Sequence, residues 1–273
     1  MSTRNLIVIS DLHCGCRLGL CPPEGVQLDD GGRYSPSEFQ CRMWALWQEF
    51  WRSWVPMVTR GEPYSVVLNG DAVDGVHHGS VTQVSHNLVD QGEIAYRVLA
   101  PVVATAEEYW HIRGTEAHVG KSGQEEERLA KRLGAKPNDS GQHARWELWK
   151  HVGDALVHIL HHIGTTSSSA YESTAVYKEL VEAYVEAGRW GDRPPDVIVR
   201  SHRHRYFQTK VPAKNGSAFA VVTPAWQGKT PFTFKLAGAR QSQPQFGGIC
   251  IRQGDEEYFV REMVWKLERP SAE

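Results

Sequence analysis

The sequence predicts an α/β fold with a mixed sheet, and two observations support this prediction. Short apolar runs rich in β-forming residues alternate with longer segments of helical periodicity. The segment "ARWELWKHVGDALVHILHH" instead resembles two strands joined by a tight "VGD" turn, so at least one strand pair is expected to be antiparallel. The chain has 273 residues, of which 41% are hydrophobic. That is enough for one sizeable core, and we expect a single domain over residues 1–273.

The expected elements follow from these patterns in chain order. Strands are predicted at residues 5–10, 64–69, 108–113, 155–160, 196–200 and 217–223. Helices are predicted from residue 35 to about residue 60, and at 88–106, 122–134 and 171–188. The helix at 122–134 is rich in Glu, Lys and Arg, which we interpret as a solvated face.

The first helix has a start signal and an aromatic face. At its start, Ser35 can act as the cap, Pro36 suits the first helical position, and Glu38 completes a capping box. The face consists of tryptophans at spacings of three and four, namely Trp44, Trp47, Trp51 and Trp54. Such a stripe can bind a ligand, but packing against a sheet is the interpretation we adopt.

Charge and hydropathy exclude some classes of partner. A formal net charge of -2 creates no global field that would attract a long polyanion such as duplex DNA, so any phosphate binding must come from local groups. No apolar run approaches the roughly 20 residues of a membrane span, and the first residues show no signal-peptide pattern. We therefore expect a cytoplasmic protein without a membrane partner.

Acidic and imidazole side chains follow five of the predicted strands. In chain order they are Asp11 and His13, Asp71 and Asp74, His118, His161 and His162, and His202 and His204. Because the carboxyl ends of neighbouring strands share one edge in α/β folds, we expect these side chains to converge. A divalent cation would neutralise the cluster, and a mixed nitrogen and oxygen ligand set suits manganese, iron or zinc better than magnesium or calcium.

The blocks that carry these residues resemble a known set of motifs. In order, "SDLHCG", "NGDAVDG", "RGTEAH", "LHH" and "SHRH" are similar to the motifs of the calcineurin-like metallophosphoesterase superfamily. Those motifs run Asp-x-His, Gly-Asp-x-x-Asp, Gly-Asn-His-Asp/Glu, a strand-end His, and Gly-His-x-His. The resemblance spans residues 6–206. It implies two packed mixed β-sheets flanked by helices, and a binuclear centre of two divalent metal ions.

The resemblance also implies a role for each matching residue. The first metal would be held by Asp11, His13 and His204, the second by His161 and His202, and both by a bridging Asp71. We prefer His161 to His162 because it comes first after the apolar run. Asp74 is expected to orient a ligand from behind rather than to bind metal.

Two blocks depart from the family pattern. Ser201 stands where the family has Gly, and Thr115 stands where the family has an Asn that binds the second metal. The missing oxygen could come from Thr115, Glu116 or Asn87. The histidine of this block is displaced to His118, which we predict to be the general acid that protonates the leaving oxygen.

The resulting functional prediction is a metal-dependent phosphoric ester hydrolase that uses a hydroxide bridging two metals. Arg113 and His78 are candidates for binding the phosphate-ester substrate, as are Arg203 and His77. Protein serine/threonine phosphatases of this superfamily carry Arg-Gly after the last Asp of the second block, whereas Asp74 is followed by Gly-Val.

We therefore expect a phosphodiesterase acting on a nucleotide or a nucleic-acid end. The alternatives are a broad phosphomonoesterase and a catalytically weakened binding or scaffold protein of the same fold. The oligomeric state stays open.

Overall fold

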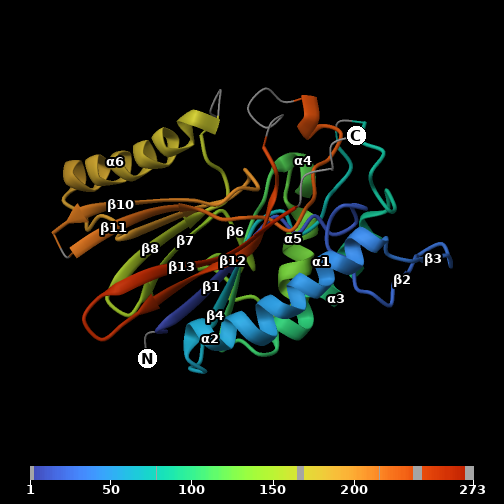
Figure 1. Cartoon of the computed structure of the whole chain (residues 1–273), viewed down its shortest axis with the longest axis horizontal. Helices are drawn as coiled ribbons and strands as arrows, with labels where there is room; N and C mark the ends of the chain where they lie inside the picture. Colours follow the sequence, from blue (N-terminus) through green and yellow to red (C-terminus); the bar gives the residue numbers. More distant parts are fainter. Residues whose placement is uncertain (1–2, 78, 165–168, 215, 236–241, 268–273) are drawn as a thin grey trace.

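Two β-sheets pack face to face, and helices cover the outer side of each (Figure 1). The structure is a computed structural model that describes residues 3–77, 79–164, 169–214, 216–235 and 242–267. The larger sheet has the strand order β13-β12-β1-β4-β5-β6, and the other sheet has the order β10-β11-β9-β8-β7. The predicted architecture of two packed mixed sheets flanked by helices is confirmed.

The six-stranded sheet contains a parallel unit extended by a hairpin. Its parallel strands are β1 (Asn5–Ile9), β4 (Ser65–Asn69), β5 (Tyr109–Ile112) and β6 (Ala144–Arg145). On the other side of β1, β12 (Gln245–Gln253) and β13 (Tyr258–Lys266) add antiparallel. The carboxyl ends of the parallel strands therefore lie along one edge of this sheet.

The five-stranded sheet is also mixed. The strands β8 (Ala155–Leu160), β9 (Val197–Arg200) and β11 (Gly216–Val222) are parallel. The outer strands β7 (Glu147–Val152) and β10 (Phe207–Ala213) are antiparallel to their neighbours. Since β7 pairs with β8 through a turn at Gly153, the hairpin predicted within residues 144–162 is confirmed. A small third sheet joins β2 (Val26–Gln27) and β3 (Arg33–Tyr34).

The helices form the two outer layers, with α6 along one side and α1 and α2 along the other (Figure 1). The six-stranded sheet is covered by α1 (Glu38–Glu49), the π-helical η1 (Phe50–Trp54), α2 (Val55–Thr59), α3 (Leu88–Val103) and α5 (Gln124–Arg132). The five-stranded sheet is covered by α6 (Glu172–Trp190). Short elements are α4 (Glu116–Val119), η2 (Ser169–Tyr171) and η3 (Thr233–Lys235). Among the described residues, no helix has both the length and the apolar character that crossing a membrane requires.

The central strands are buried on both faces. In β1, Leu6 and Val8 face the interior between the sheets, whereas Ile7 and Ile9 face the helices. A strand with two buried faces is apolar at every position rather than at alternate ones. This is why "NLIVI" and "SVVLN" stand out in the sequence as continuous apolar runs.

The first helix begins later than predicted. It starts at Glu38, and the cap is Ser37, whose hydroxyl accepts from the Gln40 amide at 3.2 Å while Gln40 Oε1 accepts from the Ser37 amide at 3.1 Å. The predicted cap at Ser35 is therefore wrong. The observed box is favoured because the Gln40 side chain also donates to the carbonyl oxygens of Cys16 and Gly19, which fixes the helix to the loop after β1.

The tryptophan stripe lies in the core, as interpreted. Trp47 and Trp54 are buried, and Trp44 and Trp51 pack against the same core cluster. The Trp47 ring meets the Trp226 ring edge to face, with the ring centres 4.9 Å apart. The interpretation of residues 122–134 as a solvated face is wrong at one position, since Glu126 of α5 is fully buried.

Removal of the Trp47 ring should lower stability without changing metal affinity. We expect Trp47→Ala to reduce the free energy of unfolding by about 3 kcal/mol or more, because a large buried ring leaves a cavity. Urea unfolding measures this loss. The control is Trp190→Ala, since Trp190 is 77% exposed and its loss should change stability by no more than about 0.5 kcal/mol. A stable Trp47→Ala variant with impaired substrate binding would contradict the assignment to the core.

Candidate metal centre

The loops that follow β1 and β4 run side by side and are joined by backbone hydrogen bonds. The Asp11 amide donates to the Gly70 carbonyl oxygen and the His13 amide donates to the Asp71 carbonyl oxygen, both at 3.0 Å. Within the five-stranded sheet, the Ser201 amide donates to the His161 carbonyl oxygen at 2.8 Å, and across the two sheets the Trp226 amide, which follows β11, donates to the Asp11 carbonyl oxygen at 2.9 Å. Loops from both sheets therefore meet at one edge of the molecule.

Most of the predicted metal ligands have left-handed backbone conformations. The described non-glycine residues with positive φ are Asp11, His13, Asp71, His202 and His204, at 44° to 71°, and Arg60 at the end of α2. A left-handed L-residue costs about 1–2 kcal/mol, so the fold accepts this cost at five of the six predicted ligands. Such strain concentrates where side chains must be aimed at a functional site.

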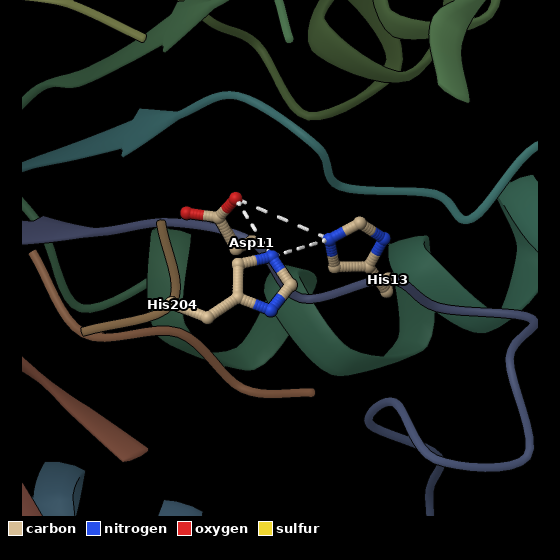
Figure 2. Close-up of side chains that lie close together, drawn as sticks. All are labelled: Asp11, His13 and His204. Carbon is tan, nitrogen blue, oxygen red and sulfur yellow. Dashed lines mark hydrogen bonds and ion pairs between the residues drawn. The ribbon is translucent and has the colours of Figure 1, made fainter. Parts of the chain in front are cut away.

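The first predicted ligand set forms one compact group (Figure 2). Asp11 Oδ1 lies 3.3 Å from His204 Nε2 and 4.0 Å from His13 Nε2. The two imidazole nitrogens are 3.1 Å apart. Asp11 Oδ1 is buried and has no hydrogen-bond partner within the described part of the chain. A buried carboxylate oxygen faced by two imidazole nitrogens suits a shared cation better than a hydrogen-bond network.

The second predicted set forms a group beside the first. Asp71 Oδ2 lies 3.1 Å from His161 Nε2, and Asp71, His161 and His202 can bring one ligand atom each within 4.8 Å of the others. His161 Nε2 is also 4.0 Å from Asp11 Oδ1, so the two groups adjoin. His161 is fully buried and its Nδ1 donates to the Asn69 carbonyl oxygen at 2.6 Å, which turns Nε2 toward the site. The exposed His162 instead lies against the rings of His161 and His202.

Asp74 lies behind the first group. Its Oδ1 is 3.2 Å from His13 Nδ1, which is the ring nitrogen opposite the one that faces Asp11. The amides of Gln83 and Gln227 donate to its two carboxylate oxygens at 2.7 and 3.0 Å. A carboxylate on the far nitrogen fixes the orientation of a ligating imidazole. The two glutamines come from distant loops, and nothing in the sequence pattern signals them.

A chain of hydrogen bonds lies beneath the site and joins four of its loops. The Asn69 amide donates to Ser201 Oγ at 2.7 Å, Ser201 Oγ lies 2.6 Å from Thr223 Oγ1, and Thr223 Oγ1 lies 2.7 Å from Ser10 Oγ. Ser10 then donates to the Pro224 carbonyl oxygen at 3.2 Å. Ser10 directly precedes Asp11, Ser201 directly precedes His202, and Asn69 is separated from Asp71 by Gly70 alone. The hydroxyl at Ser201, where the family pattern has Gly, is thus a link in this chain.

The third block brings Thr115 into the second group. Thr115 Oγ1 lies 3.2 Å from Asp71 Oδ2 and 3.0 Å from His202 Nδ1, and the Thr115 amide donates to Asp71 Oδ1 at 2.7 Å. Of the three candidates for the missing oxygen, Asn87 caps α3 and donates to Asp29, and Glu116 is exposed. A Cβ on Gly114 would overlap Asp71 Oδ1, so this approach requires glycine.

His118 reaches the site from α4 in a defined tautomer. Its Nδ1 donates to the Asp74 carbonyl oxygen at 2.6 Å, and because a carbonyl oxygen can only accept, Nε2 carries the lone pair. Nε2 lies 3.9 Å from Asp71 Oδ2. Burial lowers the pKa of His118 to about 4. At neutral pH the ring is uncharged, so it must take up a proton at Nε2 before it can act as an acid.

The charges of the site are strongly linked. Burial would raise the pKa of both Asp11 and Asp71, but the surrounding histidines together outweigh it, His161 most strongly, and both pKa values lie below the usual range. Burial opposes protonation of His161, yet Asp71 and Asp11 prevail and raise its pKa to about 10. Burial and then the His161 charge lower the pKa of His202 to about 4. The acids thus require a positive charge, which a divalent cation can supply in place of the proton.

The predicted substrate-binding residue Arg113 is not brought to this cluster. The Arg113 guanidinium donates to the Ala144 carbonyl oxygen at 2.9 Å and lies 3.8 Å from Glu127, so it points toward α5 and β6. The prediction for Arg113 therefore requires correction: Arg113 directly follows β5, and its amide and guanidinium donate to the Arg145 and Ala144 carbonyl oxygens of β6, which directs the side chain away. His78 lies outside the described residues. Its neighbour His77 is placed at the site, with Nε2 3.6 Å from Asp74 Oδ2.

Comparisons with known proteins find likeness in fold at low similarity. Vps29 from Chaetomium thermophilum has 11% identity and a TM-score of 0.41, covering 97% of this chain and 98% of that chain. A metallophosphoesterase from Sphaerobacter thermophilus has 10% identity and a TM-score of 0.41, covering 97% and 88%. A 5'-nucleotidase from Candida albicans has 8% identity and a TM-score of 0.40, covering 96% and 51%.

No protein-family model matches the sequence, and no curated protein matches it. At these identities and scores the structural likenesses carry no functional assignment, which rests on the side chains described above.

His161 should make the stability of the chelated protein depend on pH. Its pKa is raised from 6.5 to about 10, so the folded state holds this proton more tightly than the unfolded chain does. The contribution to the free energy of unfolding is complete below pH 6.5 and is lost as the pH rises through about 10. Urea unfolding of the chelated protein across this range should show the loss, and His161→Gln should lack it. Stability that increases over the same range would contradict the assignment.

Proposed function

We propose that this protein is a metal-dependent phosphoric ester hydrolase with a binuclear centre. The observation that carries the proposal is the pair of adjoining ligand groups, Asp11 with His13 and His204, and Asp71 with His161 and His202. Their mixed nitrogen and oxygen donors suit manganese, iron or zinc. Two such cations supply a water of lowered pKa and neutralise phosphoryl oxygens.

The residues of the chain then have distinct tasks. Asp71 offers one oxygen to the second group, and its other oxygen is held by the Thr115 amide. Asp74 fixes the His13 ring from behind. Asp71 and His13 thereby keep their orientation during turnover, which lowers the cost of reorganisation in the transition state.

His118 is the group proposed to move a proton. Its Nδ1 is fixed on the Asp74 carbonyl oxygen, so its Nε2 lone pair faces the cluster and can take a proton from water. The same nitrogen can then deliver that proton to the leaving oxygen. The low pKa of the free ring favours the uncharged form that starts this cycle.

The substrate is proposed to be a phosphodiester, on a nucleotide or a nucleic-acid end. Within the described part of the chain, the ion pairs of Asp11, Asp71 and Asp74 involve histidines and no Lys or Arg. A diester carries one negative charge at phosphorus, whereas a monoester dianion gains more from additional fixed cations. The site's own charges therefore favour the diester.

A binding or scaffold protein of the same fold is the second candidate. Thr115 favours it, since a hydroxyl is a poorer ligand than the amide oxygen of the family pattern. Hydrolysis of nitrophenyl mono- and diesters, assayed in parallel with manganese and with a chelator, separates the candidates. Manganese-dependent diester hydrolysis supports the enzyme, and metal binding without turnover supports the scaffold.

Asp71→Asn should abolish nearly all turnover. The substitution keeps the shape of the side chain but removes the negative charge that serves the second group and adjoins the first. Chelation of the wild-type protein should have the same effect and should also lower thermal stability, because bound metal stabilises the folded state. Steady-state rates with manganese measure the effect. Turnover of Asp71→Asn within a few-fold of wild type would exclude the two-metal proposal.

His118→Ala should affect substrates according to their leaving groups. Esters with poor leaving groups need a proton and should slow by about a hundredfold to ten-thousandfold, whereas nitrophenyl esters should slow much less. Metal content should stay unchanged. Both quantities are measured on the same preparation. Equal losses for both ester classes, together with lost metal, would make His118 a ligand instead of the proton carrier.

A further inference from the structure

Glu126 is a buried carboxylate in a helix whose charged residues otherwise suggest a solvated surface. It lies in the first turn of α5 and is fully buried. Within the described residues it forms no ion pair with Lys or Arg, and it lies close to His111, whose Nε2 is 3.7 Å from Oε1. Burying a carboxylate costs several kcal/mol unless hydrogen bonds compensate, so its partners are informative.

The partners of Glu126 are two backbone amides in the ligand-bearing loops. Oε1 accepts from the Ala72 amide at 3.1 Å, and Oε2 accepts from the Gly114 amide at 2.7 Å. Ala72 directly follows Asp71, and Gly114 directly precedes Thr115. The Thr115 amide in turn donates to Asp71 Oδ1 at 2.7 Å. One carboxylate therefore holds the loop after β4 and the loop after β5 in fixed relation.

We propose that Glu126 is a positioning residue for the second metal group. By fixing the Ala72 and Gly114 amides, it sets where the Asp71 carboxylate and the Thr115 hydroxyl stand relative to each other and to His161. This inference rests on the proposed metal-dependent function. It adds a residue that contacts neither metal nor substrate yet controls the geometry of the ligands.

The adjacent Glu127 offers a matched control. It lies on the same helix, and its carboxylate accepts from the backbone amides of His143 and Ala144 at 2.8 to 3.1 Å. These amides belong to the start of β6 and its approach, which carry no predicted ligand. Glu127 also lies 3.8 Å from the Arg113 guanidinium and 3.3 Å from His143 Nδ1. Loss of either carboxylate removes comparable backbone hydrogen bonds, but only Glu126 accepts from backbone amides of the loops that carry Asp71 and Thr115.

The test compares Glu126→Gln with Glu127→Gln in manganese binding. In Glu126→Gln the new NH2 group faces a backbone N–H, so one of the two loops loses its acceptor. We expect the weaker manganese site to lose affinity by about 10- to 100-fold in titration calorimetry. The electron paramagnetic resonance signal of a coupled manganese pair should weaken as well. Glu127→Gln should keep both properties within about twofold, even where urea unfolding shows an equal loss of stability.

The possible outcomes separate the positioning role of Glu126 from the proposed metal-dependent function. Wild-type manganese affinity in Glu126→Gln, or an equal loss in Glu127→Gln, would overturn the positioning role and leave the proposed function intact. Failure of the wild-type protein to bind manganese would overturn both. Should Glu126→Gln not fold, Glu126→Asp carries the same test, since it retains the charge but is shorter by one methylene and can reach only one loop. Its manganese affinity is judged by the same criterion.

Discussion

The burial of three carboxylates without a Lys or Arg partner is the constraint on which the rest of this structure depends. Asp11, Asp71 and Asp74 are essentially inaccessible to water. In the described part of the chain they face imidazoles instead. Leaving such charges uncompensated would cost several kcal/mol each, and imidazoles balance them only when protonated. A cation among these groups would balance the charge in place of protons, so electrostatics alone favours metal binding here before any catalytic role is considered.

The remaining polar groups of the site hold these ligands against backbone strain. Each ligand residue with a left-handed backbone conformation costs about 1–2 kcal/mol of folding free energy. A loop strained in this way relaxes unless neighbouring groups hold it in place. The hydroxyl chain from Ser10 through Thr223 to Ser201 fixes the residues that precede the ligands. Glu126 fixes the loops after β4 and β5 from the other side. Strain at the site is thus offset by buried hydrogen bonds one residue away from the ligands.

How much could be predicted from the sequence depended on whether a feature is local or requires long-range contacts. The central strands were predictable because two buried faces make them continuously apolar. The hairpin of β12 and β13 was missed, since Gly247 and Gly248 interrupt the β-forming pattern. Gly247 is required because a Cβ there would overlap the Met263 carbonyl oxygen, and a Cβ on Gly248 would crowd the Phe50 ring and the Val8 carbonyl oxygen. Glu126 was hidden within a charged run, and the direction of Arg113 depends on β6, which pairs with β5 only in the folded chain.

Thr115 should make the two ligand groups differ in their affinity for a metal ion. The first group has one carboxylate and two imidazoles, with Asp74 3.2 Å from His13 and His161 4.0 Å from Asp11, and no hydroxyl lies between its ligand atoms among the described residues. In the second group the Thr115 hydroxyl lies within 3.3 Å of Asp71 Oδ2, His161 Nε2 and His202 Nδ1, but it has a single proton to donate. A hydroxyl in this position can accept from protonated His161 and donate to Asp71 or His202, which stabilises the group without a cation. The second site should therefore exchange its metal more readily than the first. Without a metal, the Thr115 hydroxyl can still hydrogen-bond the ligand atoms of the second group, whereas the first group has no such hydroxyl among the described residues.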